Sequence, residues 1–367
     1  MDFIEMLPIT PRLEQPLRAA LRGDVSEWPD DLTETEVRAL VLHGVAPLVY
    51  AAARVPRLRG EAIRAAALEA LRAKDVRGVL DSLASANVPA LVLKGTALAY
   101  DLYTSPDLRP RGDTDLLIAA RDLDAARAVF VQLGFEEQPL TGDEHGMRQT
   151  VFTRADASGV VQMYDVHWAI ANTPLFASAL AFDDLLASAR PLSFLGPNAL
   201  GLSDVDALLL ACIHRVAHHH DSDRIIWLAD IALLRDRMSR DEHERFWRAA
   251  ARARIVGACV VSVRRANEWM SRPDVHRAGE WLSRDELERD EASRVFLDRD
   301  LTRGALLAAN LRALPWRARL QRLRQVAFPP ARFVQQSFGT RNRLALPWLY
   351  LARGVRGVLR LFRRVGA

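Results

Sequence analysis

The sequence predicts an α/β core with a small mixed sheet, flanked by an N-terminal helical segment and a C-terminal all-helical domain. Two observations support this fold class. Between residues 87 and 168, short apolar runs of strand-like composition alternate with helix-like segments, an order typical of a compact mixed sheet. From Phe182 onward a helical period dominates. We therefore divide the chain into an N-terminal segment (1–86), a core (87–200), a helical domain (201–300) and a basic tail (301–367).

The N-terminal segment is expected to be helical. Residues 1–30 are interrupted by prolines and predict a short helix and a loop. Thr33 and Glu36 have the spacing of a capping box, which predicts a helix that continues through residues 37–54. The Ala- and Leu-rich residues 61–86 predict a long helix. Its apolar positions would lie against the sheet, among them Ile63, Ala67, Leu71 and Leu80.

The core begins with a strand, a turn and a helix. Residues 91–93 are an apolar run that predicts the strand, and Lys94 and Gly95 form the turn. Thr96 is the expected N-cap of a helix over 96–103. A helix N-terminus offers unpaired backbone N–H groups and a partial positive charge, so this turn suits a triphosphate. Gly95 would let the backbone approach a phosphate closely.

Two carboxylates follow on the next predicted strand. Side chains alternate along a strand, so Asp113 and Asp115 would share one face with Leu117. Adjacent carboxylates repel each other unless a cation lies between them, and hard oxygen ligands select Mg²⁺ or Mn²⁺. The alternative is a pair of solvated surface acids without a metal.

A third acid lies on a later strand. Residues 160–168 have strand composition, and alternation places Met163, Asp165 and His167 on one face. Trp168 would face the core. Asp165 would join the metal site or accept a proton, unless it is a surface acid. His167 would be a hydrogen-bond partner or proton carrier in the cleft, or else a structural histidine.

The other elements are predicted from hydrophobic periodicity and from the positions of glycine and proline. A helix is expected over 122–133, ended by Gly134, and a strand over 149–154, joined to the Asp165 strand by a turn at 156–159. Four helices follow, over 204–219, 224–238, 240–253 and 255–270. The prolines at 315, 329, 330 and 347 divide the tail into short helices.

These residues resemble the nucleotidyltransferase superfamily that shares the polymerase beta catalytic core, whose pattern is Gly-Ser or Gly-Gly, a helix, Asp-x-Asp and a later Asp. More narrowly, the chain is similar to a bacterial family of uncharacterised nucleotidyltransferases. The shared features are the Lys-Gly turn, a Leu-Tyr pair in the helix, Arg109 shortly before Asp-x-Asp, and Asp-x-His-Trp downstream. The resemblance covers roughly residues 35–235. Thr96 replaces the usual Ser or Gly, and Gly95 and Asp113 are further apart than in the superfamily pattern.

The resemblance implies an enzyme that transfers a nucleoside monophosphate from an NTP, with ATP as the first candidate. The acceptor would carry a hydroxyl group, on a small molecule, a protein or an RNA end. Asp113, Asp115 and Asp165 would hold one or two Mg²⁺ or Mn²⁺ ions. Lys94, with the Gly95 and Thr96 backbone, would grip the β and γ phosphates, and Arg109 would clamp a leaving phosphate. The alternative is a non-catalytic nucleotide-binding module, attached to a membrane or nucleic acid by its tail.

A histidine-rich stretch at 214–220 is a second place to look for a site. His214 and His218 are four residues apart on a helix, a spacing that can bind metal, but no Glu lies between them and no cysteine is near. We expect His214 to face the cleft between core and helical domain, and residues 218–220 to be a polar helix end. Asp230 would line the same cleft or cap a neighbouring helix, and Arg111 would be a solvated charge.

The tail differs in charge from the rest of the chain. The net charge is +4, and residues 301–367 hold 14 Arg and no Asp or Glu, so the first 300 residues sum to 4 − 14 = −10. Residues 348–364 predict an amphipathic helix with five Arg on one side. Its apolar side consists of Trp348, Leu351, Ala352, Val355, Val358, Leu359 and Phe362. The helix would dock on the acidic body, lie on an anionic membrane or bind nucleic-acid phosphates.

Whole-chain composition suggests a cytoplasmic protein. No apolar run approaches the roughly 20 residues of a membrane span, and the N-terminus carries acids where a secretory signal has a basic region. Cys212 and Cys259 are the only cysteines, and their apolar neighbours predict buried thiols in a reducing compartment. Lys74 and Lys94 are the only lysines in an Arg-rich chain, which makes an ammonium at position 94 an unusual choice. The alternative is a solvated or salt-bridged lysine.

Overall fold

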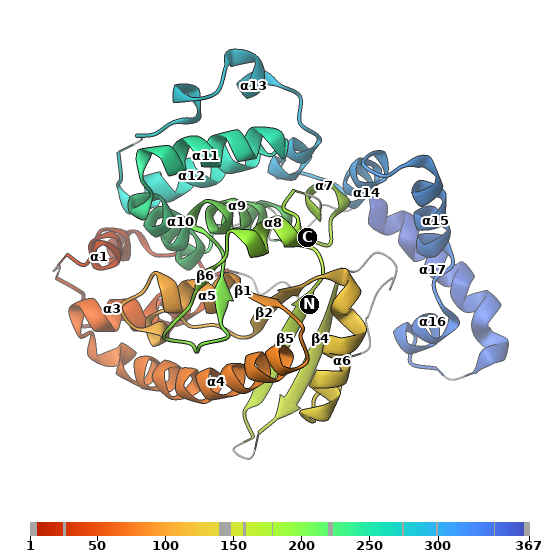
Figure 1. The fold of residues 1–367 in the computed structure, drawn as a ribbon, viewed down its shortest axis with the longest axis horizontal. Coiled ribbons are helices and arrows are strands. Elements are labelled where there is room, and N and C mark those ends of the chain that lie inside the picture. The colour runs from red at the N-terminus through yellow and green to blue at the C-terminus, as the bar shows by residue number, and fades with distance from the viewer. Residues whose placement is uncertain are drawn as a thin grey trace.

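The computed structural model describes residues 6–24, 27–138, 148–156, 159–177, 179–218, 223–273, 275–298, 300–340 and 342–362. Within these ranges one mixed sheet of seven strands forms the centre of the core, in the order β3-β4-β5-β2-β1-β7-β6 (Figure 1). Strands β2 and β5 pair in parallel, as do β1 and β7, and the other neighbours are antiparallel. The predicted small mixed sheet is therefore confirmed.

The strands divide into four that were predicted and three that were not. The predicted strands are β1 (Ala90–Leu93), β2 (Thr114–Ile118), β4 (Gln149–Ala155) and β5 (Val161–His167). The others are β3 (Glu136–Glu137), β6 (Arg190–Pro191) and β7 (Leu200–Gly201). A two-residue strand has no measurable alternation. Strands β6 and β7 lie after Phe182, where the sequence indicates a helical period, and are therefore not predicted. Residues 157–158 of the predicted turn between β4 and β5 lie outside the described ranges.

Four helices precede the sheet: α1 (Pro11–Arg22), α2 (Glu34–Leu42), α3 (Ala46–Ala53) and α4 (Arg59–Ser85). The capping box of Thr33 and Glu36 is present at the start of α2, as predicted. The expected single helix through residue 54 is wrong, because the chain breaks at Gly44, whose φ is 75°. Residues 1–5 and 25–26 of the predicted N-terminal helix and loop are outside the described ranges.

Helix α4 runs along one face of the sheet (Figure 1). Its buried residues are Glu69, Val76, Val79, Leu80 and Leu83. Of the positions expected against the sheet only Leu80 is buried, whereas Ile63 is 58% and Leu71 40% exposed and Ala67 is also exposed. At 100° per residue these three lie on the opposite side of the helix from Val76 and Leu80. The helix is present as predicted, but the stripe of this Ala-rich helix that is buried is the one with Val76 and Leu80.

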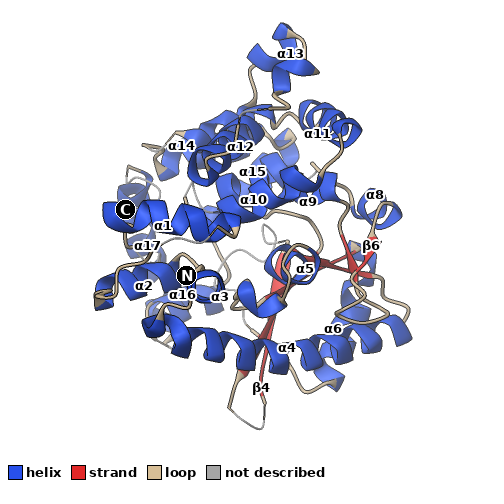
Figure 2. Cartoon of the chain, turned by 90° about the vertical axis from the view of Figure 1, so that its left-hand side faces the viewer, coloured by secondary structure: helices blue, strands red, loops and turns tan. Residues whose placement is uncertain are grey.

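Apolar layers cover both faces of the sheet. On one face, Val92 and Leu116 pack with residues of α4 and of α6 (Leu123–Gln132), which ends before Gly134 as predicted. On the other face, Leu93 and Leu117 join the core of the helical domain. The strands thus alternate as the sequence indicates, and the second face lies beneath the helical domain (Figure 2).

The helical domain is built on α9 (Asp204–Ile213), α10 (Ile225–Arg237), α11 (Arg240–Arg252) and α12 (Val256–Met270), as predicted. Shorter helices are α7 (Pro174–Ala177), α8 (Phe182–Ala187) and α13 (Arg284–Glu288). Helix α9 passes into a π-helical stretch, His214–His218, instead of continuing as an α-helix. His219 and His220 lie outside the described residues. Cys212 and Cys259 are free and buried, as expected.

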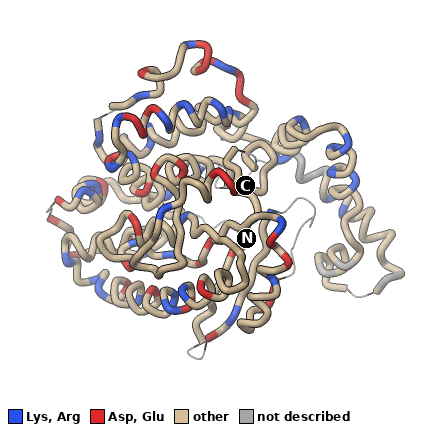
Figure 3. Tube along the Cα trace, viewed as in Figure 1, with Lys and Arg blue, Asp and Glu red and all other residues tan. Residues whose placement is uncertain are grey.

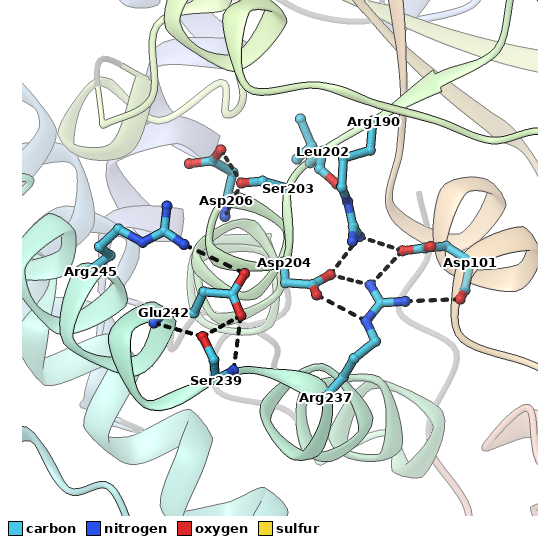
Figure 4. A network of polar contacts seen from close by, with 10 residues as sticks. All are labelled: Asp101, Arg190, Leu202, Ser203, Asp204, Asp206, Arg237, Ser239, Glu242 and Arg245. Atoms are coloured by element: carbon cyan, nitrogen blue, oxygen red, sulfur yellow. Dashed lines mark hydrogen bonds and ion pairs between the residues drawn. The ribbon is translucent and has the colours of Figure 1, made fainter.

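An ion-pair network joins the core to the helical domain (Figure 4). Arg237, at the end of α10, donates from Nη2 to Asp101 Oδ2 at 2.6 Å and from Nε to Asp204 Oδ2 at 3.0 Å. Arg190 of β6 contacts the same two acids, at 2.9 Å from Asp101 Oδ2 and 2.5 Å from Asp204 Oδ1. Asp101 ends α5 (Lys94–Asp101) and Asp204 begins α9. The helix after the turn is therefore fixed to the domain above it.

The basic tail forms four helices beside the body: α14 (Arg303–Arg312), α15 (Trp316–Ala327), α16 (Ala331–Ser337) and α17 (Leu346–Leu361). Prolines separate the first three, whereas Pro347 lies in the first turn of α17, where proline is tolerated. Figure 3 shows the basic residues of the tail apart from the mixed charges of the body. Arg363 and Arg364 of the predicted amphipathic helix lie outside the described residues.

Four apolar side chains of the predicted amphipathic helix do not dock on the body. Trp348, Leu351, Val355 and Phe362 are 73%, 59%, 57% and 79% exposed, so that expectation is wrong for these side chains. In the described ranges no single helix is long and apolar enough to cross a membrane. Helices α2 and α3, which are bent relative to each other, together have the length and composition of a membrane span, and nothing else in those ranges indicates one.

Candidate active site

The turn between β1 and α5 places a lysine at the edge of the sheet. Helix α5 begins at Lys94 directly after β1, with Leu93 as its N-cap. The expected N-cap role of Thr96 is therefore wrong: Thr96 is buried in the first turn, and its hydroxyl donates to the Asp113 carbonyl oxygen at 3.5 Å. Lys94 has a φ of 49°, a conformation that costs a non-glycine residue about 1–3 kcal/mol. Strain of this kind tends to be kept where a site requires it.

Two carboxylates lie side by side on adjacent parallel strands. Asp115 of β2 is the register partner of Asp165 of β5, and on its other side it pairs with Leu93 of β1. Lys94 Nζ lies 2.7 Å from Asp115 Oδ1. Gln149 of β4 donates from Nε2 to Asp165 Oδ2 at 3.3 Å. The two acids therefore face the start of α5, as the alternation of β2 and β5 predicts.

A histidine completes this group. Nε2 of His167 lies 2.8 Å from Asp115 Oδ1, and the ring is buried beneath the carboxylate. Asp115, Asp165 and His167 each offer a ligand atom within 4.8 Å of the others. Asp113 precedes β2 and is not in this close group, so its role as a metal ligand stays a prediction.

Arg109 is held by a buried ion pair. Its Nε lies 3.2 Å from both carboxylate oxygens of Asp230 in α10, and its Nη2 lies 2.6 Å from Oδ2. The Tyr103 hydroxyl donates to Asp230 Oδ1 at 2.7 Å. Of the two expectations for Asp230, the structure therefore supports its place at the cleft and not a helix cap. Nη1 of Arg109 is directed toward Gly95, where a Cβ atom would lie 2.4 Å from it.

Arg111 is buried and not solvated, which corrects the sequence expectation. Its Nε and Nη2 lie 3.0 and 2.9 Å from the two carboxylate oxygens of Glu69 in α4. Nη1 donates to Thr114 Oγ1 at 2.6 Å. The Tyr100 hydroxyl also donates to Glu69, at 2.7 Å. These contacts fix the loop that carries Asp113 against the long helix.

A cavity of about 760 Å³ opens over these residues. Among the predicted site residues, its walls include Lys94, Gly95, Arg109, Asp113, Asp115, Asp165 and His214. Asp230 and Trp227 also line it, and the His214 ring meets that of Trp227 edge to face with centroids 5.3 Å apart. Thr96 and His167 are buried behind the wall. The cavity lies where the core, α4 and the helical domain meet.

A family model described as uncharacterised nucleotidyltransferase matches residues 33–271, which include every residue named in this cavity. The chain belongs to this nucleotidyltransferase family. It is accordingly an enzyme of the nucleotidyltransferase class, as the resemblance implied. The basic tail lies beyond the matched residues. A search of curated proteins finds no match to the chain.

The two carboxylates of this nucleotidyltransferase differ in their affinity for protons. Burial opposes ionisation of Asp115, but Lys94 and His167 outweigh it and hold its pKa below the ordinary range. Burial, followed by the charges of Asp115 and Asp113, raises the pKa of Asp165 to about 7. The same causes, burial and then Asp115, raise the pKa of Asp113. One acid is thus ionised beside Lys94, and its neighbour is ready to exchange a proton near neutral pH.

The donor set of the nucleotidyltransferase fits a divalent cation. Two carboxylates and an imidazole converge. Burial, followed by the charges of Asp115 and Asp113, raises the pKa of Asp165, and a cation between the acids would relieve their repulsion. Burial, followed by the Lys94 charge, lowers the pKa of His167, which keeps the imidazole neutral and able to act as a ligand. Oxygen donors suit Mg²⁺ and Mn²⁺, and the nitrogen donor is better suited to Mn²⁺.

Several residues of the site were missed or undervalued in the sequence. Gln149 orients Asp165, and Asn172 Nδ2 in turn donates to Gln149 Oε1 at 3.0 Å. Glu69 is one of four acids in the charged helix α4, so no local signal distinguishes it. Gln149 lies on the same face of the sheet as its register partner His167. Alternation along β4 could therefore have predicted its place in the site. Trp168 follows the end of β5 and is only half-buried, so its predicted place in the core is wrong.

Proposed function

We propose that this nucleotidyltransferase moves a nucleoside monophosphate from an NTP, with ATP as the first candidate, to a hydroxyl group on an acceptor bound in the same cavity. The observation that carries the proposal is the pairing of Asp115 with Asp165 opposite Lys94 at the start of α5. We further place the family in the polymerase-beta-like superfamily and take the chain to be bacterial, on the pattern of Lys-Gly, Asp-x-Asp and the later Asp.

The triphosphate would lie along the wall formed by Lys94, Gly95 and the first turn of α5. Backbone N–H groups at this helix end and the Lys94 ammonium supply positive potential for the phosphates. Arg109 commits Nε and Nη2 to Asp230 and directs Nη1 toward Gly95. That remaining donor is placed to bind a phosphate oxygen that reaches Gly95. Thr96 contributes through its backbone, since its hydroxyl bonds to Asp113.

The acids would serve the transfer itself. The acceptor hydroxyl must lose a proton as it attacks the α-phosphorus, and the Asp165 carboxylate, which lines the same cavity, would accept it. Asp115 and Asp165 with His167 would hold the divalent cation, and Asp113 would add a further carboxylate. When bound, the cation neutralises charge that develops on the phosphate oxygens. His214 would contact the nucleotide or the acceptor from the opposite wall.

The acceptor stays open between a small molecule, a protein side chain and an RNA end. A non-catalytic module that binds nucleotide without transferring it would not need three acids, yet Asp113, Asp115 and Asp165 all line the cavity. The cytoplasmic location stays a prediction, which cell fractionation would test.

Labelled ATP tests the reaction type. We expect an acceptor in cell extract to become labelled from α-labelled ATP and not from γ-labelled ATP, with release of pyrophosphate. Asp115→Asn and Asp165→Asn should abolish labelling, whereas Asp124→Asn, which alters an exposed acid on α6, should not. Label that reaches an acceptor only from the γ position would show phosphoryl transfer and overturn the proposal.

A further inference from the structure

We propose that the basic tail binds the surface of a lipid bilayer that contains anionic lipids, with α15 and α17 lying in the interface between headgroups and acyl chains. This inference goes beyond nucleotidyl transfer and is independent of it. It rests on exposed apolar side chains, on the charge of the tail and on the way α16 packs behind α17.

Helix α17 presents an unpartnered apolar side. Trp348, Leu351, Val355 and Phe362 are all more than half exposed. At 100° per residue they lie within about 60° of one another on the helix. The other side of α17 is occupied, because the Arg353 guanidinium stacks on the Phe333 ring at 5.1 Å from its centroid.

A second contact of this kind fixes the direction of the apolar side. The Arg356 guanidinium lies 4.9 Å from the centroid of the Phe338 ring, just after α16. The Tyr350 hydroxyl donates to the Pro329 carbonyl oxygen at 2.5 Å. Helix α16 and its flanking residues therefore contact α17 on the side of Arg353 and Arg356, whereas Trp348, Leu351 and Val355 face solvent.

Helix α15 repeats the pattern. Trp316, Leu320 and Leu323 are 64%, 59% and 44% exposed, at the i, i+4 and i+7 positions of one helix face. Arg317 and Arg324 lie on the flank of this face at about 100° per residue, and both are exposed. An apolar stripe bordered by cationic side chains and containing Trp is typical of helices that lie in a membrane interface.

Charge selects among the possible occupants. With 14 Arg and no acid over residues 301–367, two tails would repel each other, which disfavours pairing of two copies through their tails. The phosphates of nucleic acid would satisfy the arginines but would leave Trp348, Leu351 and Trp316 in water. An anionic bilayer offers both negative headgroups and an apolar layer beneath them.

Sedimentation with vesicles tests the proposal. We expect the full chain to sediment with vesicles of equal parts phosphatidylcholine and phosphatidylglycerol, and much less with phosphatidylcholine alone. Trp348→Glu with Leu351→Glu should weaken binding by at least about tenfold. Arg317→Gln with Arg324→Gln should weaken it several-fold and reduce its salt dependence.

Matched controls distinguish binding through this surface from nonspecific hydrophobic binding. Val131→Glu on α6 and Phe194→Glu remove side chains that are 63% and 82% exposed elsewhere on the molecule, and should leave vesicle binding unchanged. Equal sedimentation of the tail variants and the wild type would overturn the proposal. The proposal would also be overturned if the protein bound neither kind of vesicle and instead bound single-stranded RNA. It would likewise be overturned if the protein self-associated and Trp348→Glu abolished that self-association.

Discussion

Gly95 and Arg109 occupy adjoining space at the start of α5, and a side chain at position 95 would collide with the guanidinium. A Cβ atom there would lie 2.4 Å from Nη1 and 3.2 Å from Cζ of Arg109. The end of an arginine side chain can usually move aside, but this one is buried and paired with Asp230. The glycine therefore protects the position of Arg109, in addition to any approach of phosphate.

We predict that Gly95→Ala lowers stability and displaces Arg109, with a net cost of about 1–3 kcal/mol. The matched control is Gly78→Ala in α4, where a Cβ atom would meet nothing within 4 Å. In that helix the substitution should stabilise the protein by about 0.5–1 kcal/mol. Urea unfolding of both variants measures the difference. If both substitutions raised stability equally, the contact with Arg109 would carry no constraint.

Proton release on metal binding should follow from the raised pKa of Asp165, about 7 in the metal-free protein. A raised carboxyl pKa contributes stability below the ordinary value of 3.8 that is lost as pH rises through about 7. A divalent cation binds the ionised form, so we predict that affinity for Mn²⁺ rises by up to about tenfold per pH unit below pH 7 and then levels off.

Calorimetry in buffers of different ionisation enthalpy counts the released protons. Asp165→Asn should remove most of this release and flatten the pH dependence of any remaining affinity. Proton release that persisted unchanged in Asp165→Asn would show that another group titrates.

His43 should make the protein sensitive to acid. Burial lowers its pKa to about 4, and the ring is held neutral, since the Ile225 N–H donates to Nδ1 at 3.3 Å and Nε2 lies 3.1 Å from the Leu7 carbonyl oxygen. A lowered pKa gives stability that is present above 6.5 and lost as pH falls toward 4. The full loss is about 3 kcal/mol.

Unfolding experiments at a series of pH values between 4 and 7 would measure that loss. His43→Gln should lower stability at pH 7 and weaken its dependence on pH over this window. A variant with the same pH slope as the wild type would assign acid sensitivity to other groups.

The parts of this fold that the sequence predicts are those with a strong local period. The four longer strands and helices α9–α12 repeat every two or every 3.6 residues, and Asp115, Asp165 and His167 follow from strand alternation alone. Their convergence needs the parallel pairing of β2 with β5, which the order of elements suggests. The strands β6 and β7 are too short to show a period.

What the sequence did not predict depends on partners distant along the chain. Arg111 is buried because Glu69, 42 residues away, satisfies it. Asp230 reaches the cavity because Arg109, 121 residues away, pairs with it. Asp113 lies outside the close group of Asp115, Asp165 and His167, because β2 begins one residue after it. Such outcomes are set by tertiary contacts, and local patterns do not contain them.

Binding of ATP with and without Mg²⁺ tests the central claim most directly, namely that acids from neighbouring strands hold a cation beside the lysine-bearing turn. Isothermal calorimetry should show ATP binding by the wild type that strengthens when Mg²⁺ is added. The double variant Asp115→Asn/Asp165→Asn, checked for folding by circular dichroism, should lose this dependence on Mg²⁺. ATP binding that is equally strong, and equally enhanced by Mg²⁺, in wild type and double variant would contradict the account.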